Sequence, residues 1–216
     1  MAKKKEFKGR TKIGFVLDRS GSMNTIKPSV ISGFNEWINE QQKVKDDTVM
    51  TLTMFDTTYT SHYIDRPIGQ VSHLTTTAYR PEIGGMTALY DAIAHCVQQM
   101  EIGLGEKDRA LMVILTDGQE NSSKEFDRVA IKKLIEDHEA KGNWTFTYLS
   151  ASPTAFEDAR DIGTQSGNVA VFAATPQGVA QGFRTTSKST LSYRGGATGQ
   201  SMSFYQPEDD EPEEKE

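Results

Sequence analysis

The sequence lacks residues and runs that several classes of protein require. Cys96 is the single cysteine, which excludes an intramolecular disulfide and a zinc cluster of thiolates. No pair of histidines has a zinc-binding spacing such as His-x3-His; the four are His62, His73, His95 and His138. No apolar run is long enough to cross a bilayer, and the lysines near the N-terminus precede no signal-peptide core. We therefore expect a cytoplasmic protein without membrane contacts.

The motifs of common nucleotide-binding proteins and hydrolases are also missing. No Gly-x-x-x-x-Gly-Lys sequence is present, which excludes a P-loop. Gly103-Leu104-Gly105 follows a predicted helix and lacks the third glycine of a dinucleotide-binding turn. Ser20 lies in Arg-Ser-Gly rather than Gly-x-Ser-x-Gly, so the sequence does not indicate a hydrolase nucleophile.

Charge is distributed unevenly along the chain, whose formal net charge is −6. Residues 1–12 contain six basic residues and one acidic residue, whereas the last ten residues, PEDDEPEEKE, contain seven acidic residues and one lysine. The part between them is mildly acidic, so no broad basic surface favours a nucleic-acid partner. We expect residues 1–12 to form a flexible basic arm. Residues 193–216, rich first in Gly and Ser and then in acids, are expected to be disordered.

Between these ends, predicted strands alternate with predicted helices. Strand patterns occupy residues 13–18, 48–55, 59–64, 109–116, 143–150 and 168–173. Helical spacing of apolar residues occupies 26–40, 89–100, 124–141, 155–164 and 175–191. Continuous apolar runs at 13–18 and 109–116 are typical of strands that are buried on both faces. The alternation predicts an α/β fold with a mostly parallel central sheet flanked by helices.

Side chains with oxygen donors follow the predicted strands. Asp18 ends the first buried run and is followed at alternate positions by Ser20 and Ser22. Asp117 ends another buried run, and Thr87 follows a pair of glycines at a helix start. Because the carboxyl ends of parallel strands meet at one edge of a sheet, we expect these five residues to converge on one crevice. A donor set made only of oxygen suits a hard cation such as Mg²⁺, with Mn²⁺ or Ca²⁺ as alternatives.

A simpler interpretation of Asp18–Ser22 is turn chemistry, since Asp and Ser side chains often bond to their own backbone at the start of a helix. The presence of the Thr87 and Asp117 segments favours the metal site over this alternative.

Three segments together resemble the von Willebrand factor type A (vWA) domain and its metal ion-dependent adhesion site (MIDAS). They are DRSGS at 18–22, GGMTALYDAI at 84–93 and LTDGQENS at 115–122. The resemblance covers about residues 11–192, and we place the vWA domain at residues 13–192. It implies a Rossmann-like three-layer sandwich with Ser20, Ser22 and Thr87 as direct metal ligands. Asp18 and Asp117 would act largely through water, and in some family members the last helix moves.

The resemblance implies a non-enzymatic, divalent-metal-dependent protein-binding module. Its Mg²⁺ would present an open coordination position to an Asp or Glu of a partner protein. The format is similar to intracellular, stand-alone bacterial or phage members of the family, and by analogy the partner could be an AAA+ ATPase or an operon neighbour. We expect a monomer rather than an oligomer.

Two alternatives stay open. One is a metal-assisted phosphohydrolase, because a strand-end Asp18 is similar to the start of the haloacid dehalogenase phosphatases. Ser20, however, replaces the second acid that such chemistry needs. The other is a scaffold that uses the fold without a metal.

Overall fold

A six-stranded sheet forms the centre of the computed structural model, which describes residues 7–205. The order across the sheet is β3-β2-β1-β4-β5-β6. The bounds are β1 Thr11–Asp18, β2 Thr48–Phe55, β3 Tyr59–Pro67, β4 Arg109–Thr116, β5 Trp144–Ser150 and β6 Val169–Val171. Only β3, at one edge, is antiparallel to its neighbour, among the strands of the described residues. The α/β fold class predicted from the sequence is confirmed.

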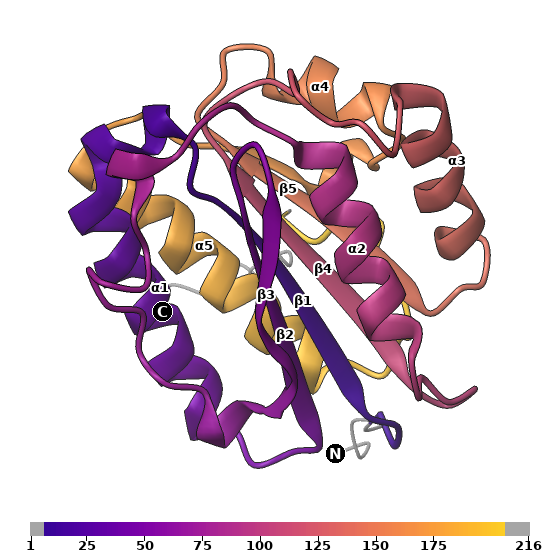
Figure 1. Ribbon diagram of the computed structural model, residues 1–216. Coiled ribbons are helices and arrows are strands. Elements are labelled where there is room, and N and C mark those ends of the chain that lie inside the picture. Colours follow the sequence, from indigo (N-terminus) through magenta and orange to yellow (C-terminus); the bar gives the residue numbers. More distant parts are fainter. Residues whose placement is uncertain (1–6, 206–216) are drawn as a thin grey trace, which may run out of the picture.

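Helices cover both faces of this sheet (Figure 1). Their bounds are α1 Lys27–Lys43, α2 Leu89–Glu101, α3 Arg128–Glu139, α4 Ala155–Asp161 and α5 Pro176–Gly195. Short 3₁₀ turns are η1 Gly21–Ile26, η2 Ile68–Gln70, η3 Pro81–Ile83 and η4 Ser166–Asn168. Between residues 7 and 205, no helix combines the length and the hydrophobicity needed to cross a bilayer.

Two hydrophobic cores fill the spaces between the three layers. One lies between the sheet and helices α1 and α5, and the other between the sheet and helices α2, α3 and α4. In the first core, the ring of Phe15 lies edge-on to the rings of Phe34 and Trp37, each 5.3 Å away between centroids. Strands β1, β2, β4 and β5 are buried along their whole length, because successive side chains enter opposite cores.

The N-terminal boundary differs from the expectation. β1 begins at Thr11, so the expected flexible arm at residues 1–12 is wrong for its last two residues. Lys12 is buried, and its ammonium group donates to the Asp65 carboxylate and to the carbonyl of Ile102, both at 2.6 Å. The acceptors come from other elements, so the local sequence gave no sign that this lysine would be buried. Residues 1–6 lie outside the described residues.

The C-terminal boundary differs from the expected one by more residues than the N-terminal boundary does. The expectation of disorder from residue 193 is wrong for residues 193–205, because α5 continues to Gly195 and the following segment lies along β5 and η4. Ser201 N–H donates to Thr145 Oγ1 at 2.9 Å, and Phe204 N–H donates to Asn168 Oδ1 at 2.8 Å. Phe204 is buried, which gives this Gly- and Ser-rich segment an apolar contact. The acidic residues 207–216 lie outside the described residues.

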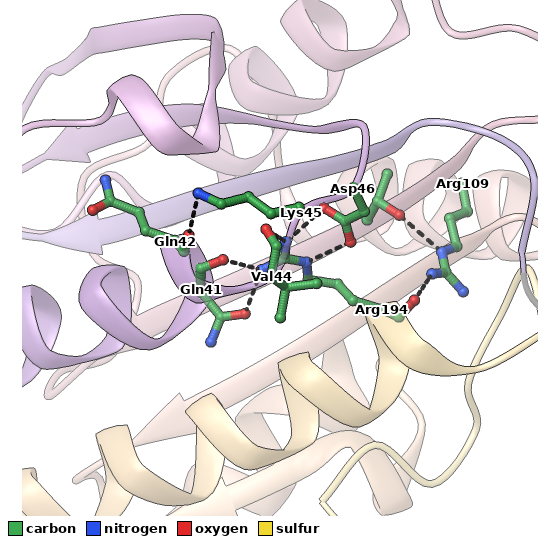
Figure 2. A network of polar contacts seen from close by, with 8 residues as sticks. Gln41, Gln42, Val44, Lys45, Asp46, Arg109 and Arg194 are labelled. Atoms are coloured by element: carbon green, nitrogen blue, oxygen red, sulfur yellow. Dashed lines mark hydrogen bonds and ion pairs between the residues drawn. The ribbon is translucent and has the colours of Figure 1, made fainter.

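The C-terminal end of α5 is held by a buried polar network (Figure 2). Arg194 donates to the Asp46 carboxylate at 2.6 Å and to the carbonyl of Gln41 at 2.7 Å. Arg109 in turn donates to the carbonyl of Arg194 at 2.8 Å. The network joins α5 to the α1–β2 connection and to the start of β4, at the end of the sheet opposite Asp18.

Candidate metal centre

The edge at which the parallel strands end carries the residues selected from the sequence. Asp18 is the last residue of β1, and Asp117 directly follows Thr116, the last residue of β4. These two strands pair directly in the middle of the sheet. Thr87 precedes Ala88, the N-cap residue of α2. The fold therefore brings together three segments that are far apart in the sequence.

Asp18 is the most deeply buried of the five predicted ligands, with no exposed surface. Its Oδ1 accepts from the backbone N–H of Ser20 and its Oδ2 accepts from Thr116 Oγ1, both at 2.6 Å. The hydroxyl of Tyr79 donates to the Asp18 carbonyl at 2.7 Å. Burial raises the pKa of the Asp18 carboxyl to about 6, although these hydrogen bonds to the carboxylate oppose the shift. A nearby cation would favour the ionised form of this carboxyl.

The two serines and Asp117 form a continuous chain of oxygens. Ser20 Oγ lies 3.1 Å from Ser22 Oγ, and Ser22 Oγ donates to Asp117 Oδ1 at 2.6 Å. Oxygens that bind Mg²⁺ at about 2.1 Å in an octahedron lie about 3.0 Å from their neighbours, so the 3.1 Å spacing of the two serine hydroxyls suits adjacent ligands. Ser22 is exposed whereas Ser20 is buried, so the chain of oxygens opens to solvent at Ser22. Burial raises the pKa of Asp117, against the hydrogen bond from Ser22.

Thr87 faces the same space. A β carbon placed on Gly118 would lie 3.6 Å from Thr87 Oγ1 and 4.0 Å from Ser22 Oγ. Both hydroxyls therefore lie around the position that a side chain at Gly118 would fill. The glycine leaves that position open to a small ligand.

The glycine pair before Thr87 permits a close approach of two loops. A β carbon on Gly84 would overlap the carbonyl of Arg19, and Gly21 N–H donates to the carbonyl of Gly85 at 3.2 Å. Loop 84–87 can therefore lie directly against loop 19–21. This contact holds the segment before Thr87 against the segment that carries Ser20.

The donor set fits a hard divalent cation. Among residues 7–205, no group of three or more His, Cys, Asp or Glu side chains is arranged to hold a metal. The five predicted residues instead offer two carboxylates and three hydroxyls, all with oxygen donors. Such a set suits a cation that retains some of its water, as Mg²⁺ does, better than a metal that prefers sulfur or imidazole ligands.

Four residues around this centre were not selected from the sequence. Thr116 and Tyr79 hold Asp18, while Asn121 and Glu120 bond to the segment that starts at Thr87. Thr116, Glu120 and Asn121 belong to the LTDGQENS segment, so their proximity could have been inferred from the motif. Tyr79 has no such signal, because its contact depends on the path of the long connection between β3 and α2.

No model of a known protein family matches the sequence, and no curated protein matches it. Several solved structures match the fold. The pilus adhesin SpaC from Lactobacillus rhamnosus GG, in its open conformation, gives a TM-score of 0.70 at 14% identity, over 88% of this chain and 31% of the adhesin chain. A von Willebrand factor type A structure from Catenulispora acidiphila gives a TM-score of 0.57 at 15% identity, over 85% of this chain and 43% of that one.

A third similar structure contains a metal. Proximal thread matrix protein 1 from the mussel byssus, described with a zinc-occupied MIDAS motif, gives a TM-score of 0.59 at 16% identity. The match covers 85% of this chain and 46% of the matrix protein. This chain thus spans less than half the length of each of the three proteins. These similarities show that the chain has the fold of vWA domains, as its motifs imply.

Proposed function

We propose that this chain is a non-enzymatic protein-binding module that depends on a divalent metal. Asp18, Ser20, Ser22, Thr87 and Asp117 would hold Mg²⁺, with Mn²⁺ or Ca²⁺ as substitutes. The bound ion would supply a positive charge and an open coordination position for an Asp or Glu of a partner protein. The chain of contacts from Ser20 Oγ through Ser22 Oγ to Asp117 Oδ1 is the observation that carries this proposal.

The arrangement of charge supports binding through an acidic side chain. Three of the five donors are neutral hydroxyls, so the two carboxylates at most balance the charge of a divalent ion. Both oxygens of Asp18 already accept a hydrogen bond within the protein, which favours a supporting role over a nucleophilic one. Ser22 is exposed, so a partner can approach the centre from that side. A carboxylate that replaces water there would bind more strongly in the partly desolvated interface.

Metal binding is tested first by titration calorimetry with Mg²⁺ and with Mn²⁺. We expect the wild type to bind both ions and Ser22→Ala to bind them more weakly. Ser32→Ala is the matched control, because Ser32 is an exposed serine on α1 outside the site. If the wild type binds neither ion, the proposal is wrong.

Partner binding is tested by affinity capture from a lysate in the presence of Mg²⁺ or EDTA. A partner retained only by the wild type with Mg²⁺, and lost by Asp18→Ala, supports the module. A partner retained under all conditions would place binding on another surface. Mg²⁺-dependent hydrolysis of phosphate esters that disappears in Asp18→Ala would contradict the non-enzymatic part of the proposal.

A further inference from the structure

The first turn of α2 is capped by a different segment of the chain. Ala88, its N-cap residue, has no side-chain oxygen to accept from the free N–H groups of that turn. Instead, Tyr90 N–H donates to Glu120 Oε2 at 3.0 Å and to Ser123 Oγ at 3.1 Å. Asp91 N–H also points to Ser123 Oγ, at 3.2 Å. The loop that follows Asp117 thus supplies the cap of the helix that follows Thr87.

Asn121 fixes the backbone of Thr87 itself. Thr87 N–H donates to the side-chain oxygen of Asn121 at 2.8 Å, and Asn121 N–H donates to the Thr87 carbonyl at 3.0 Å. Both backbone polar groups of a predicted ligand are therefore bonded to one residue. Asn121 lies only four positions after Asp117, so the pair ties the two ligand segments together.

Glu120 keeps this loop in shape. Its Oε1 accepts from the N–H groups of Ser122 and Ser123, at 2.8 and 2.7 Å. Its Oε2 accepts from Ser123 Oγ at 2.7 Å, in addition to Tyr90 N–H. Each of the two carboxylate oxygens accepts two hydrogen bonds, so the role of Glu120 is to support the loop.

A carboxylate on α2 also accepts hydrogen bonds from the loop that follows Asp117. Asp91, on α2, accepts from Lys124 N–H at 2.7 Å, from Glu125 N–H at 3.0 Å and from Phe126 N–H at 2.8 Å. The start of α2 and loop 120–126 are therefore cross-linked from both sides. Thr87 and Asp117, which lie at the ends of these two segments, cannot easily change their separation.

We propose that Asn121, supported by Glu120, is a positioning residue of the metal centre, which holds Thr87 at a fixed place relative to Asp117 and thereby sets the metal affinity. The inference rests on the proposed function, since it concerns the same centre. Asn121 itself would not bind the metal. Its effect arises because a ligand that is already held in place loses less conformational freedom when the ion binds.

The test compares Mn²⁺ affinity in three variants by titration calorimetry. Asn121→Ala removes the acceptor for Thr87 N–H and should weaken Mn²⁺ binding by about tenfold to a hundredfold, as is common for residues that orient metal ligands. Asn121→Asp keeps an oxygen at that position and should retain Mn²⁺ binding. Asp127→Ala is the matched control, because it removes the Asp127–Ala130 cap of α3 and should lower the melting temperature without removing a hydrogen bond to Thr87.

A second readout needs no metal. Hydrogen exchange of the Thr87 amide in EDTA should be faster in Asn121→Ala than in the wild type, and unchanged in Asp127→Ala. Wild-type affinity in Asn121→Ala would overturn this inference and leave the proposed function standing. Equal weakening in Asn121→Ala and Asp127→Ala would also overturn it, since the effect would then follow global stability. A wild type that binds no Mn²⁺ overturns the proposed function and this inference together.

Discussion

The guanidinium of Arg194 lies 2.6 Å from the carboxylate of Asp46, and no part of the Arg194 side chain is exposed. Asp46 is partly exposed, so the pair lies at the boundary between core and surface. Further hydrogen bonds from Arg194 to the carbonyls of Gln41, in α1, and of Val44, directly after α1, complete the network. A buried charge of this kind is stable only while its partners remain in place.

We predict that Asp46→Asn lowers the free energy of unfolding by roughly 2–3 kcal/mol near pH 7, because it leaves the buried Arg194 without its counter-charge. Asp47→Asn is the neighbouring control, since Asp47 pairs with Arg10 at the exposed surface and should cost less than about 1 kcal/mol. Urea unfolding of both variants and the wild type measures the difference. Equal losses in the two variants would contradict the burial argument.

The same pair predicts a dependence on pH. Burial alone would raise the pKa of Asp46, but the hydrogen bond and charge of Arg194 outweigh it, and the pKa lies below the ordinary value of 3.8. The unfolded state then binds more protons in acid, so the stabilisation is complete above about pH 5 and is lost as the pH falls through the folded-state pKa. The gap between the wild type and Asp46→Asn should be constant near neutral pH and close in acid. If the difference in the free energy of unfolding between the wild type and Asp46→Asn widens in acid, the pKa of Asp46 is raised in the folded state and this prediction is wrong.

Asp18→Asn should have opposite effects on stability in the absence and in the presence of the metal. Because burial raises the pKa of Asp18 from 3.8 to about 6, ionising it near pH 7 costs the metal-free fold about 3 kcal/mol. This cost shrinks as the pH falls through the folded-state pKa of about 6 and is gone once the pH is below the ordinary value of 3.8. In EDTA near pH 7, Asp18→Asn should therefore unfold at higher urea than the wild type, and the advantage should vanish near pH 4. In excess Mg²⁺ the order should reverse, since only the wild type gains stability from the ion.

Thr87 offers a test of the hydroxyl ligands. Thr87→Val keeps the shape of a buried side chain but removes its oxygen, and we predict a loss of Mn²⁺ affinity with little change in metal-free stability. Thr87→Ser restores the hydroxyl and should restore binding. Electron paramagnetic resonance of free Mn²⁺ quantifies both variants. Tight binding by Thr87→Val would remove Thr87 from the ligand set.

Local sequence patterns predicted the central strands well and the loops between them poorly. The patterns at 48–55 and 109–116 predict the observed bounds, because every position is buried and every residue except Arg109 is apolar or β-branched. The helix predicted at 124–141 begins instead at Arg128. The N–H groups of residues 124–126 are held by Asp91, and a contact with a distant segment leaves no trace in the local spacing of apolar residues.

In the candidate centre, too, some features follow from local sequence and others depend on contacts between distant segments. Hydrogen bonds connect Asp18 to Thr116 and the two serines to Asp117, as expected for residues at the ends of neighbouring parallel strands. Thr87 faces the same space beside Gly118. Among the residues that hold these side chains, Thr116, Glu120 and Asn121 lie within the LTDGQENS motif, but Tyr79 has no local signal. Tyr79 acts through the carbonyl of Asp18, and such a contact requires the folded path of the chain.

The ordered segment after α5 determines where the chain can be cut. A fragment ending at residue 192 would lack both Arg194, which bonds α5 to the α1–β2 connection, and Phe204, which covers the core beside Tyr193. It would expose apolar surface and leave the Gln41 and Val44 carbonyls without the arginine that donates to them. A stable fragment of this domain should therefore extend at least through Tyr205. A purification tag or fluorescent fusion belongs after that residue.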